Sequence, residues 1–462
     1  MLTERRGRQN LDLTTDTLAT RCSSIVRQKE SKSQDELFRN RWVRISLRAQ
    51  KKETVFNNLL THISVDSLKE AFKALSGNKA LGVDNINKLI YGKNLDKNLS
   101  NLVDQIHKGS YKPMPKREIL IPKANGKTRP IAIACFEDKL VDWVVGRILT
   151  TIFEPIFIKN SFGYRPNKSA HQAIEACYYS LYKNQRKHVV EIDFANFFNT
   201  IPHCKLMKVL NRKISDNRFK GLIGRFLKGE LINAGGKTLP SEIGTPQGSI
   251  MSPILANIYL NEVIDQWFIK NYASYNNIIV RYADDALFFF NKEENATKFL
   301  QSLGYRVNQY GLSLNKDKTN ILTLAKGEHK QFNFLGFTFY WGKQQKRIIL
   351  KIKTQKEKLI KGIQEFDNWI KKVRNKIKLK EIWQLAKSKI AGHNNYYGYW
   401  MNALKLRHFY SQATKSLFKW INRRSQKQSY TWEGFSERIK NFPLMPKLSD
   451  MKFKQVGVNP YA

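Results

Sequence analysis

The sequence predicts an α+β fold that continues into a mostly helical, basic C-terminal region. Between about residues 66 and 350, helical and strand-like segments alternate, and turn signals such as KANGKTRP (123–130) and INAGGKTLP (232–240) separate them. After about residue 350 the strand-like segments stop and the density of basic residues rises. No internal repeat is visible.

The composition indicates a globular protein with a polyanionic partner. The chain has 462 residues, of which 42% are hydrophobic and 12% aromatic, enough for roughly two to four domains. Lys and Arg number 80 against 38 Asp and Glu, which gives a formal charge of +42. Because this charge is spread along nearly the whole length, it favours a long RNA or DNA surface over the alternatives, a basic peripheral membrane protein or a ribosome-associated one.

Targeting and cysteine signals predict an intracellular, reduced protein without a membrane span. No apolar run approaches the ~20 residues of a membrane helix, and the start, MLTERRGRQN, lacks the apolar stretch of a signal peptide. None of the cysteines lies in a CxxC pair, which predicts neither a disulfide framework nor a zinc site. These cysteines are Cys22, Cys135, Cys177 and Cys204.

Basic segments near both ends of the chain are predicted to be helical. In RNRWVRISLRAQKK (39–52), Arg and Lys recur at near-helical spacing around Trp42, Val43, Ile45 and Leu47, which predicts an amphipathic helix. KKVRNKIKLK (371–380) has six basic residues and no acid, with Val373, Ile377 and Leu379 as a possible buried side. The aromatic-rich segment 393–435 completes a predicted helical bundle with a basic face. Aromatic residues at helical spacing more often belong to the core than to a ligand site, and we expect this for most of those in the segment. They are Tyr396, Tyr397, Tyr399, Trp400 and Trp420.

Two adjacent carboxylates interrupt an apolar stretch in RYADDALFF (281–289). The flanking runs predict a hairpin with Asp284 and Asp285 at or beside its turn. Buried unpaired charge is costly, and a hard divalent cation is a natural compensation. A pair of aspartates in a turn is weak evidence alone, since turn chemistry produces many.

A third carboxylate, Asp193, ends the strand-like segment VVEID. Three aspartates from two strands are what a two-metal phosphoryl-transfer site requires, with one ion activating the attacking hydroxyl and the other holding the leaving phosphate. The sequence alone leaves open whether the three converge.

Seven motifs, taken in order, resemble those of group II intron-encoded reverse transcriptases. The resemblance covers about residues 66–462. The motifs are IPKANGKTRPIAI (121–133), SFGYRPNKSAHQAI (161–174), EIDFANFFNTI (191–201), GTPQGSIMSPILANIYLNEVID (244–265), RYADDALFF (281–289), LSLNKDKT (312–319) and FNFLGFTF (332–339).

The resemblance implies a right-hand polymerase of fingers, palm and thumb. We expect a basic N-terminal extension (1–65), fingers and palm (66–350), a helical thumb/maturase domain (351–421) and a short nucleic-acid-binding segment (422–462). Asp193 and Asp284 would ligate two Mg²⁺ ions, with Asp285 in support.

The resemblance also implies a nucleotide site. Lys123 and Arg129 match residues that grip the triphosphate, and Lys318 one near the leaving pyrophosphate. Phe198 matches an aromatic residue that excludes a ribose 2′-OH and so favours dNTPs, whereas Phe197 is expected in the core. Phe194 and Gln247 complete the expected nucleotide contacts, and FNFLGF around Gly336 resembles a primer grip.

The C-terminal part resembles the maturase region of the family, which implies binding of the parent intron RNA and later of target DNA or primer. The expected contacts are Lys371, Lys372, Arg374, Lys376, Arg423 and Arg424. The chain has no Cys after Cys204, so we do not expect the Cys- and His-containing endonuclease domain found in many members. The expected location is the cytoplasm, with the nucleoid of a bacterium, or the organellar equivalent.

Three other functions stay open from the sequence. A related reverse transcriptase detached from any intron, serving repair, defence or spacer acquisition, would share the catalytic motifs, and flanking intron structure in the DNA would separate the two. A non-catalytic RNA-binding splicing cofactor has no need of clustered acids that repel RNA. An RNA-templated RNA polymerase must admit the 2′-OH, and Phe198 argues against it.

Overall fold

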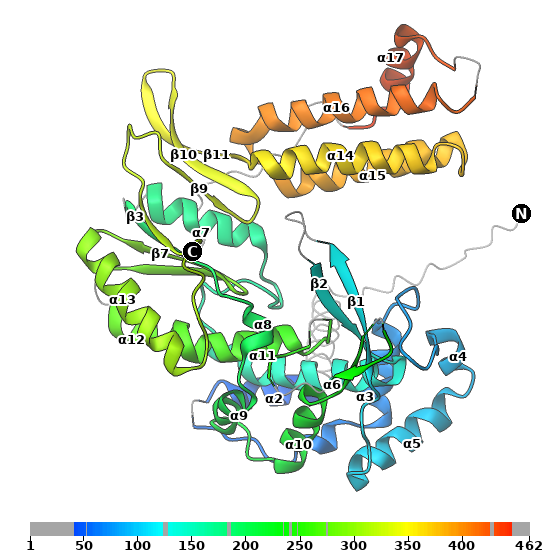
Figure 1. Ribbon diagram of the computed structural model, residues 1–462, viewed down its shortest axis with the longest axis vertical. Helices are drawn as coiled ribbons and strands as arrows, with labels where there is room; N and C mark the ends of the chain where they lie inside the picture. The colour runs from blue at the N-terminus through cyan, green and yellow to red at the C-terminus, as the bar shows by residue number, and fades with distance from the viewer. Residues whose placement is uncertain are drawn as a thin grey trace, which may run out of the picture. The chain divides into compact units, whose positions relative to one another are not determined.

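The computed structural model describes residues 41–51, 53–122, 128–182, 186–233, 235–239, 243–246, 248–273, 276–425 and 429–445. These residues form two compact units, and Figure 1 labels their helices and strands. Unit 1 combines the described residues of Met1–Ile119, Ile133–Ile156 and Leu210–Leu239; unit 2 combines those of Leu120–Ala132, Phe157–Val209 and Pro240–Ala462. The predicted α+β fold is confirmed, whereas the predicted domain boundaries stay predictions.

Unit 1 is built on helix α6 (Phe136–Phe153), which is apolar on nearly every side because α2 (Arg41–Ala49) and α3 (Val65–Ala74) both pack against it. The predicted basic helix is α2, which buries Trp42 and Ile45. The other helices of unit 1 are η1 (Leu59–His62), α4 (Lys88–Gly92), α5 (Leu95–Lys108), η2 (Glu154–Ile156) and α10 (Asn217–Leu227).

A four-stranded sheet has the order β2-β1-β4-β5. Strand β1 (Lys116–Pro122) begins in unit 1, where it runs parallel to β4 (Leu231–Ile232), and β4 pairs antiparallel with β5 (Thr238–Leu239). The chain returns from β1 through β2 (Thr128–Ile133). Residues 123–127, with the predicted triphosphate contact Lys123, lie outside the described residues.

Unit 2 contains a sheet buried on both faces. Its strands are β6 (Ile278–Tyr282), β7 (Asp285–Phe290), β3 (His188–Ile192) and β8 (Asn320–Thr323), in that order and antiparallel throughout. Phe288 and Phe290 pack against Phe299 of α13 (Glu293–Gln309), and Phe268 of α12 (Gln266–Tyr272) packs against both. Leu287 and Phe289 point to the opposite face and pack with α7 (Ala170–Tyr182). Both faces of β7 are therefore covered, which explains its uninterrupted apolar run.

A second antiparallel sheet shares the α7 side of this core. It consists of β9 (Gln331–Phe334), β10 (Phe337–Gln344) and β11 (Arg347–Thr354). The strands were expected to stop at about residue 350, but β11 continues to Thr354, because Ile352 is buried in this core and Asn402 accepts a hydrogen bond from the Thr354 amide.

The predicted helical bundle follows. Helices α14 (Lys356–Val373), α15 (Leu379–Tyr397) and α16 (Ala403–Ile421) lie side by side (Figure 1). Phe435 of α17 (Trp432–Asn441) joins their hydrophobic core, so this part of 422–462 packs on the bundle. Of the aromatic residues expected in the core, Tyr399 and Trp420 are buried, but Trp400, in η5 (Trp400–Asn402), is 57% exposed. Among the described helices, none combines the length and apolar character needed to cross a bilayer.

Candidate active site

The turn between β6 and β7 carries the two adjacent aspartates. Tyr282 pairs with Asp285, so the turn consists of Ala283 and Asp284, and the predicted hairpin is confirmed. Ala283 has a φ of 58°, in the left-handed region that residues other than glycine seldom adopt. A two-residue hairpin turn commonly requires such a conformation at its first central position.

The register of β3 on β7 brings the third aspartate to this turn. Ile192 lies opposite Ala286, and Asp193 follows one residue later, beside the strand position of Asp285. Burial raises the pKa of both Asp284 and Asp285, and the charge of Asp193 adds to both shifts, so the three carboxyl groups lie within electrostatic reach of one another. The three aspartates therefore meet at one end of this sheet, although their carboxyl groups are not drawn together closely enough to hold an ion.

The three carboxylates repel one another in a partly desolvated site. Desolvation, together with the charges of Asp284 and Asp193, raises the pKa of Asp285 to about 6. Burial likewise raises the pKa of Asp284, whereas Arg129 and Arg281 favour its charged form. Asp285 itself is exposed, so solvent weakens the repulsion it experiences.

A fourth carboxylate, Glu191, belongs to this cluster and was missed from the sequence. Desolvation together with Asp285 and Asp193 raises the pKa of Glu191 to about 7. Side chains two apart on a strand share a face, so the spacing of Glu191 and Asp193 in VVEID carried the signal.

The loop 312–319 holds Asp193. Lys318 donates a hydrogen bond from Nζ to Asp193 Oδ2 over 2.9 Å, and Asn315 donates from Nδ2 to the same oxygen over 3.2 Å. The hydrogen bond to Asp193 raises the pKa of Lys318. Lys318, the predicted pyrophosphate contact, thus lies at the predicted metal-binding aspartates, and Asn315 is a further residue there that the sequence did not single out.

Helix α8 (Phe197–Thr200) carries the predicted sugar-selecting residue. Phe198 is half-buried, whereas Phe197 is only 3% exposed, as expected for a core residue. Phe194 is also buried and packs against Phe197 with ring centroids 5.1 Å apart, so a nucleotide contact at Phe194 would fall to its backbone. The Phe198 carbonyl accepts a hydrogen bond from the Thr245 amide over 2.6 Å, which ties α8 to the GTPQG segment.

The same segment approaches the strand that carries Arg129. Gly248 has a φ of +112°, and a Cβ atom there would lie 2.5 Å from the Ala132 carbonyl oxygen of β2, so only glycine fits. Arg129 is also on β2, and its positive charge favours the ionised form of the Asp284 carboxyl group. The predicted contact Gln247 lies outside the described residues.

The chemistry of the donors fits a hard divalent cation. Carboxylate oxygens are the ligands that Mg²⁺ prefers, and a cation would relieve the mutual repulsion that raises the pKa values of Asp284 and Asp285. Across the described parts of the chain, however, no three His, Cys, Asp or Glu side chains are already grouped closely enough to hold an ion. Asp193 instead holds the Lys318 ammonium group.

The segment that carries this site matches a family model described as reverse transcriptase (RNA-dependent DNA polymerase), over residues 121–339. The chain is also 33% identical over 289 residues to protein YkfC of Escherichia coli strain K12, a match that covers 55% of this chain and 74% of YkfC. The chain belongs to the reverse transcriptase family.

Two further relatives of this chain have names that refer to introns. The group II intron-encoded protein LtrA of Lactococcus lactis subsp. cremoris is 34% identical over 224 residues, 48% of this chain and 37% of LtrA. The putative COX1/OXI3 intron 2 protein of Saccharomyces cerevisiae is 33% identical over 191 residues, 41% of this chain and 22% of that protein. The predicted resemblance to group II intron-encoded reverse transcriptases is confirmed, although the matches span well under half of these two relatives.

In the helical bundle, basic residues predicted to bind nucleic acid gather around one indole ring. At the end of α14, Lys371 Nζ lies 5.6 Å and Arg374 Cζ 4.8 Å from the centroid of the Trp420 ring. Arg423 follows α16, and its Cζ lies 5.5 Å from the same centroid. Lys419 adds a fourth cation at 4.8 Å. We call these four cations and Trp420 the indole cluster.

The other predicted contacts lie near the indole cluster but outside it. Lys372 and Lys376 are exposed. Arg424 donates from Nη2 to the Ile377 carbonyl oxygen over 3.3 Å, so it also links the end of α16 to the segment after α14.

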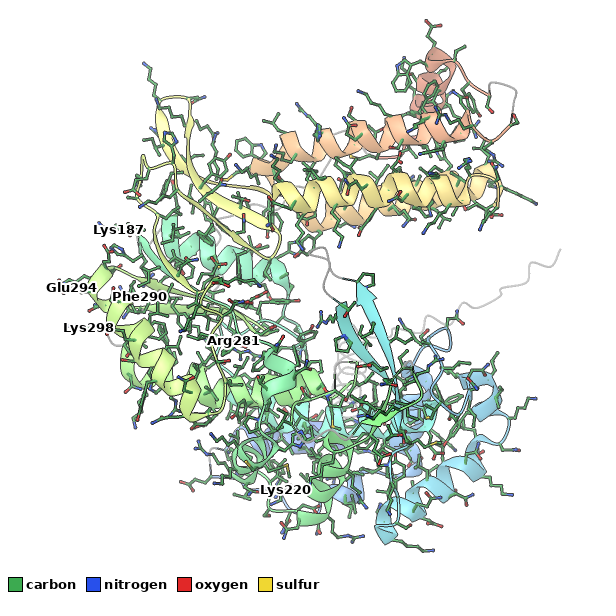
Figure 2. All side chains as sticks on the ribbon, viewed as in Figure 1. Lys187, Lys220, Arg281, Phe290, Glu294 and Lys298 are labelled. Atoms are coloured by element: carbon green, nitrogen blue, oxygen red, sulfur yellow. The ribbon has the colours of Figure 1, made fainter. Side chains whose placement is uncertain are left out.

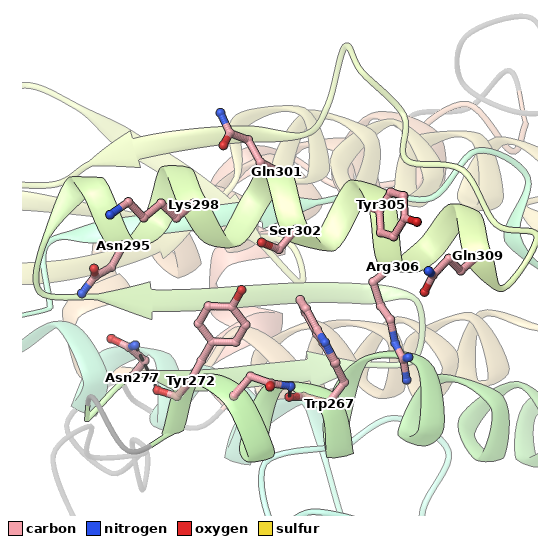
Figure 3. Close-up of a pocket in the computed structure, with 11 residues that line it drawn as sticks. Trp267, Tyr272, Asn277, Asn295, Lys298, Gln301, Ser302, Tyr305, Arg306 and Gln309 are labelled. Carbon is pink, nitrogen blue, oxygen red and sulfur yellow. Dashed lines mark hydrogen bonds between the residues drawn. The ribbon is translucent and has the colours of Figure 1, made fainter.

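A separate groove lies between α12 and α13 (Figure 3). Its lining includes Trp267, Tyr305 and Lys298 and several amide side chains, but none of the predicted site residues. The candidate active site is therefore defined by the convergence of motifs and not by this groove.

The desolvation of Asp285 and its repulsion by the neighbouring carboxylates predict that Asp285→Asn stabilises the protein when divalent cations are removed. The folded-state pKa of Asp285 is about 6, above its ordinary value of 3.8. The destabilising effect of its charge is therefore absent below about pH 4, develops between the two values and is complete above about pH 6. In EDTA, Asp285→Asn should raise the melting temperature at about pH 7.5 and raise it less at about pH 4.5.

Mg²⁺ provides the control for this prediction. Because a cation would neutralise the cluster, Mg²⁺ at pH 7.5 should raise the melting temperature of the wild type more than that of Asp285→Asn. A variant that melts lower than the wild type at both pH values would show that the carboxylates do not repel one another.

Proposed function

We propose that this protein is an RNA-dependent DNA polymerase that also binds group II intron RNA as a maturase. The observation that carries the polymerase part is the meeting of Asp193, Asp284 and Asp285 at one end of the β3–β7 ladder. Asp193 and Asp284 would hold two Mg²⁺ ions, supported by Asp285. When bound, Mg²⁺ supplies the Lewis acidity that activates a primer 3′-hydroxyl and stabilises charge on the leaving phosphate.

The cations beside the carboxylates would bind the triphosphate. Arg129 acts on Asp284, and Lys318 contacts Asp193 directly, so both lie where negative phosphates must arrive. Lys318 would exchange its bond with Asp193 for the phosphates as a nucleotide binds. Lys123 is proposed as a further triphosphate contact on its motif alone.

Phe198 supports DNA synthesis over RNA synthesis. Its half-buried ring is carried by α8, shortly after Asp193, and its backbone carbonyl oxygen accepts a hydrogen bond from Thr245 of the GTPQG segment. An apolar ring there offers no hydrogen bond to a ribose 2′-OH and occupies the space that this group needs. The neighbouring Phe197 is held in the core, so Phe198 is the residue of the pair that is available to the sugar.

The maturase part rests on the bundle and on the relatives. The indole cluster concentrates four cations around Trp420. The Trp420 ring is held by a hydrogen bond from its Nε1 to Asp367 Oδ1. Such an array suits the phosphates of a large RNA. The name of LtrA, group II intron-encoded protein, makes intron RNA the first RNA to test.

The polymerase proposal predicts that Asp284→Asn abolishes cDNA synthesis without weakening RNA binding. Removing one charge from the metal site should lower the rate of primer extension on an RNA template by at least about 100-fold. Extension of a radiolabelled primer with Mg²⁺ and dNTPs measures the rate, and filter binding measures affinity for the primer–template. Parallel reactions with rNTPs should give little product.

Asp317→Asn is the matched control, because Asp317 is an exposed carboxylate in the same loop as Lys318. It should extend the primer at the wild-type rate. Extension by Asp284→Asn at the wild-type rate would refute the site assignment. A wild type that makes no product but binds intron RNA tightly would favour the non-catalytic splicing cofactor, and efficient use of rNTPs would favour an RNA polymerase.

The indole cluster predicts a salt-dependent contribution to RNA binding. Replacing Lys371, Arg374 and Arg423 together with Gln should weaken binding of intron RNA. It should also reduce the slope of log K against log salt concentration by about 2, given a slope of about 0.7 per lost single-strand phosphate contact. The control replaces Lys93, Lys97 and Lys108, which are exposed in unit 1, and changes the net charge equally. Equal effects of the two triple substitutions would mean that the cluster acts only through net charge.

A further inference from the structure

Arg281, labelled in Figure 2, is on β6 close before the aspartate turn and is completely buried. Its guanidinium group forms a two-pronged ion pair with Asp265: Nε donates to Oδ1 over 2.8 Å and Nη2 to Oδ2 over 2.5 Å. Both side chains have 0% exposure. Asp265 ends a short π-helical segment, η3 (Asn261–Asp265), that continues α11 (Ser252–Leu260).

The remaining guanidinium nitrogen connects this pair to the turn. Arg281 Nη1 donates to the Ala283 carbonyl oxygen over 2.9 Å and to Asn257 Oδ1 over 2.8 Å. Asn257, buried on α11, donates from Nδ2 to the Gly163 carbonyl oxygen over 2.8 Å. The Arg281 guanidinium group therefore bonds Ala283, which directly precedes Asp284, and also bonds η3 and α11.

The backbone around the turn is also closely enclosed. A Cβ atom at Gly163 would overlap the amide nitrogen of Ala283, so the SFGYRPN segment lies directly against the turn. The Phe162 amide donates to the Arg281 carbonyl oxygen over 2.8 Å, and the Arg281 amide donates to the Asn160 carbonyl oxygen over 2.9 Å. Ala283 therefore keeps its left-handed conformation under contacts from two sides.

Stability alone does not account for a buried pair of this kind. Apolar side chains of similar volume commonly stabilise a core as well as a buried ion pair does, because the pair loses its hydration. What apolar side chains cannot supply is a set of directional hydrogen bonds that end on a chosen backbone atom. Here one of those bonds ends on the Ala283 carbonyl, one residue from Asp284.

We propose that Arg281 is a positioning residue for catalysis: paired with Asp265 and Asn257, it fixes the Ala283 carbonyl and so sets where the Asp284 carboxylate points. This inference rests on the proposed polymerase function of Asp284. In this arrangement Asp284 would touch the metal and the substrate, whereas the buried Arg281 orients Asp284.

The test replaces the ion pair with apolar side chains in the double variant Arg281→Met/Asp265→Leu. The positioning role predicts a melting temperature close to that of the wild type and an unchanged affinity for primer–template. The single-turnover rate of dNTP addition should fall by at least about tenfold, because small misplacements of reacting groups are costly. Mn²⁺ binding, measured by electron paramagnetic resonance, should weaken as well. A folded double variant with wild-type rate and Mn²⁺ affinity would overturn the inference.

The control is Arg306→Met/Glu262→Leu. It removes a partly buried pair, 3.7 Å apart in the same unit, whose arginine donates to the backbone carbonyl oxygens of Val263 and Glu262. This control should keep the wild-type rate and Mn²⁺ affinity, and an equal loss of rate in both double variants would contradict a specific positioning role.

Two further outcomes remain decisive. If the Arg281→Met/Asp265→Leu variant does not fold, Asn257→Leu takes its place, since it leaves the ion pair intact and removes only the link through Asn257. A fall in rate with retained melting temperature supports positioning, and a wild-type rate opposes it. If the wild type itself makes no cDNA, the proposed function fails, and Mn²⁺ binding alone decides: weaker binding by the double variant supports the inference, and equal binding overturns it.

Discussion

The register between β3 and β7 is the constraint on which the candidate site depends. Ile192 opposite Ala286 sets Asp193 beside the start of β7, and Glu191 shares the face of Val189 and Leu287. A slip of one residue would turn every side chain of β3 to the other face. The apolar residues on both faces prevent this slip, because Val189 packs with α7 while Phe288 packs with α13. Core packing thus fixes the position of the carboxylates.

The site concentrates negative charge, although the chain as a whole has a formal charge of +42. Asp193, Asp284, Asp285 and Glu191 oppose one another electrostatically, and the fold tolerates this because Lys318, Arg129 and Arg281 lie close by. These cations differ in kind. Lys318 is 66% exposed, whereas Arg281 is buried and all three of its guanidinium nitrogens donate hydrogen bonds. One group is suited to exchange with a ligand and the other to holding the backbone.

The sequence predicted the parts of the site that local pattern encodes. A pair of charges between two apolar runs identified the hairpin, and the family motifs identified Asp193, Phe198 and Lys318. Residues whose role depends on long-range pairing were missed. The spacing of Glu191 and Asp193 puts them on one face, but only the register brings Glu191 near Asp285, and Asn315 and Asp265 gain their roles only through partners in other segments. Trp400 was expected in the core but is exposed, because helical spacing alone does not tell which side of a bundle is covered.

The central claim is that Asp193 and Asp284 hold the divalent cations for DNA synthesis. Anomalous X-ray scattering from Mn²⁺, in crystals of the protein with an RNA template, a DNA primer and an incoming dNTP, tests it most directly. The account predicts Mn²⁺ peaks in contact with the carboxylates of Asp193 and Asp284 and with the triphosphate, and Lys318 released from Asp193. Mn²⁺ bound only at other residues, with Lys318 still paired to Asp193, would contradict it.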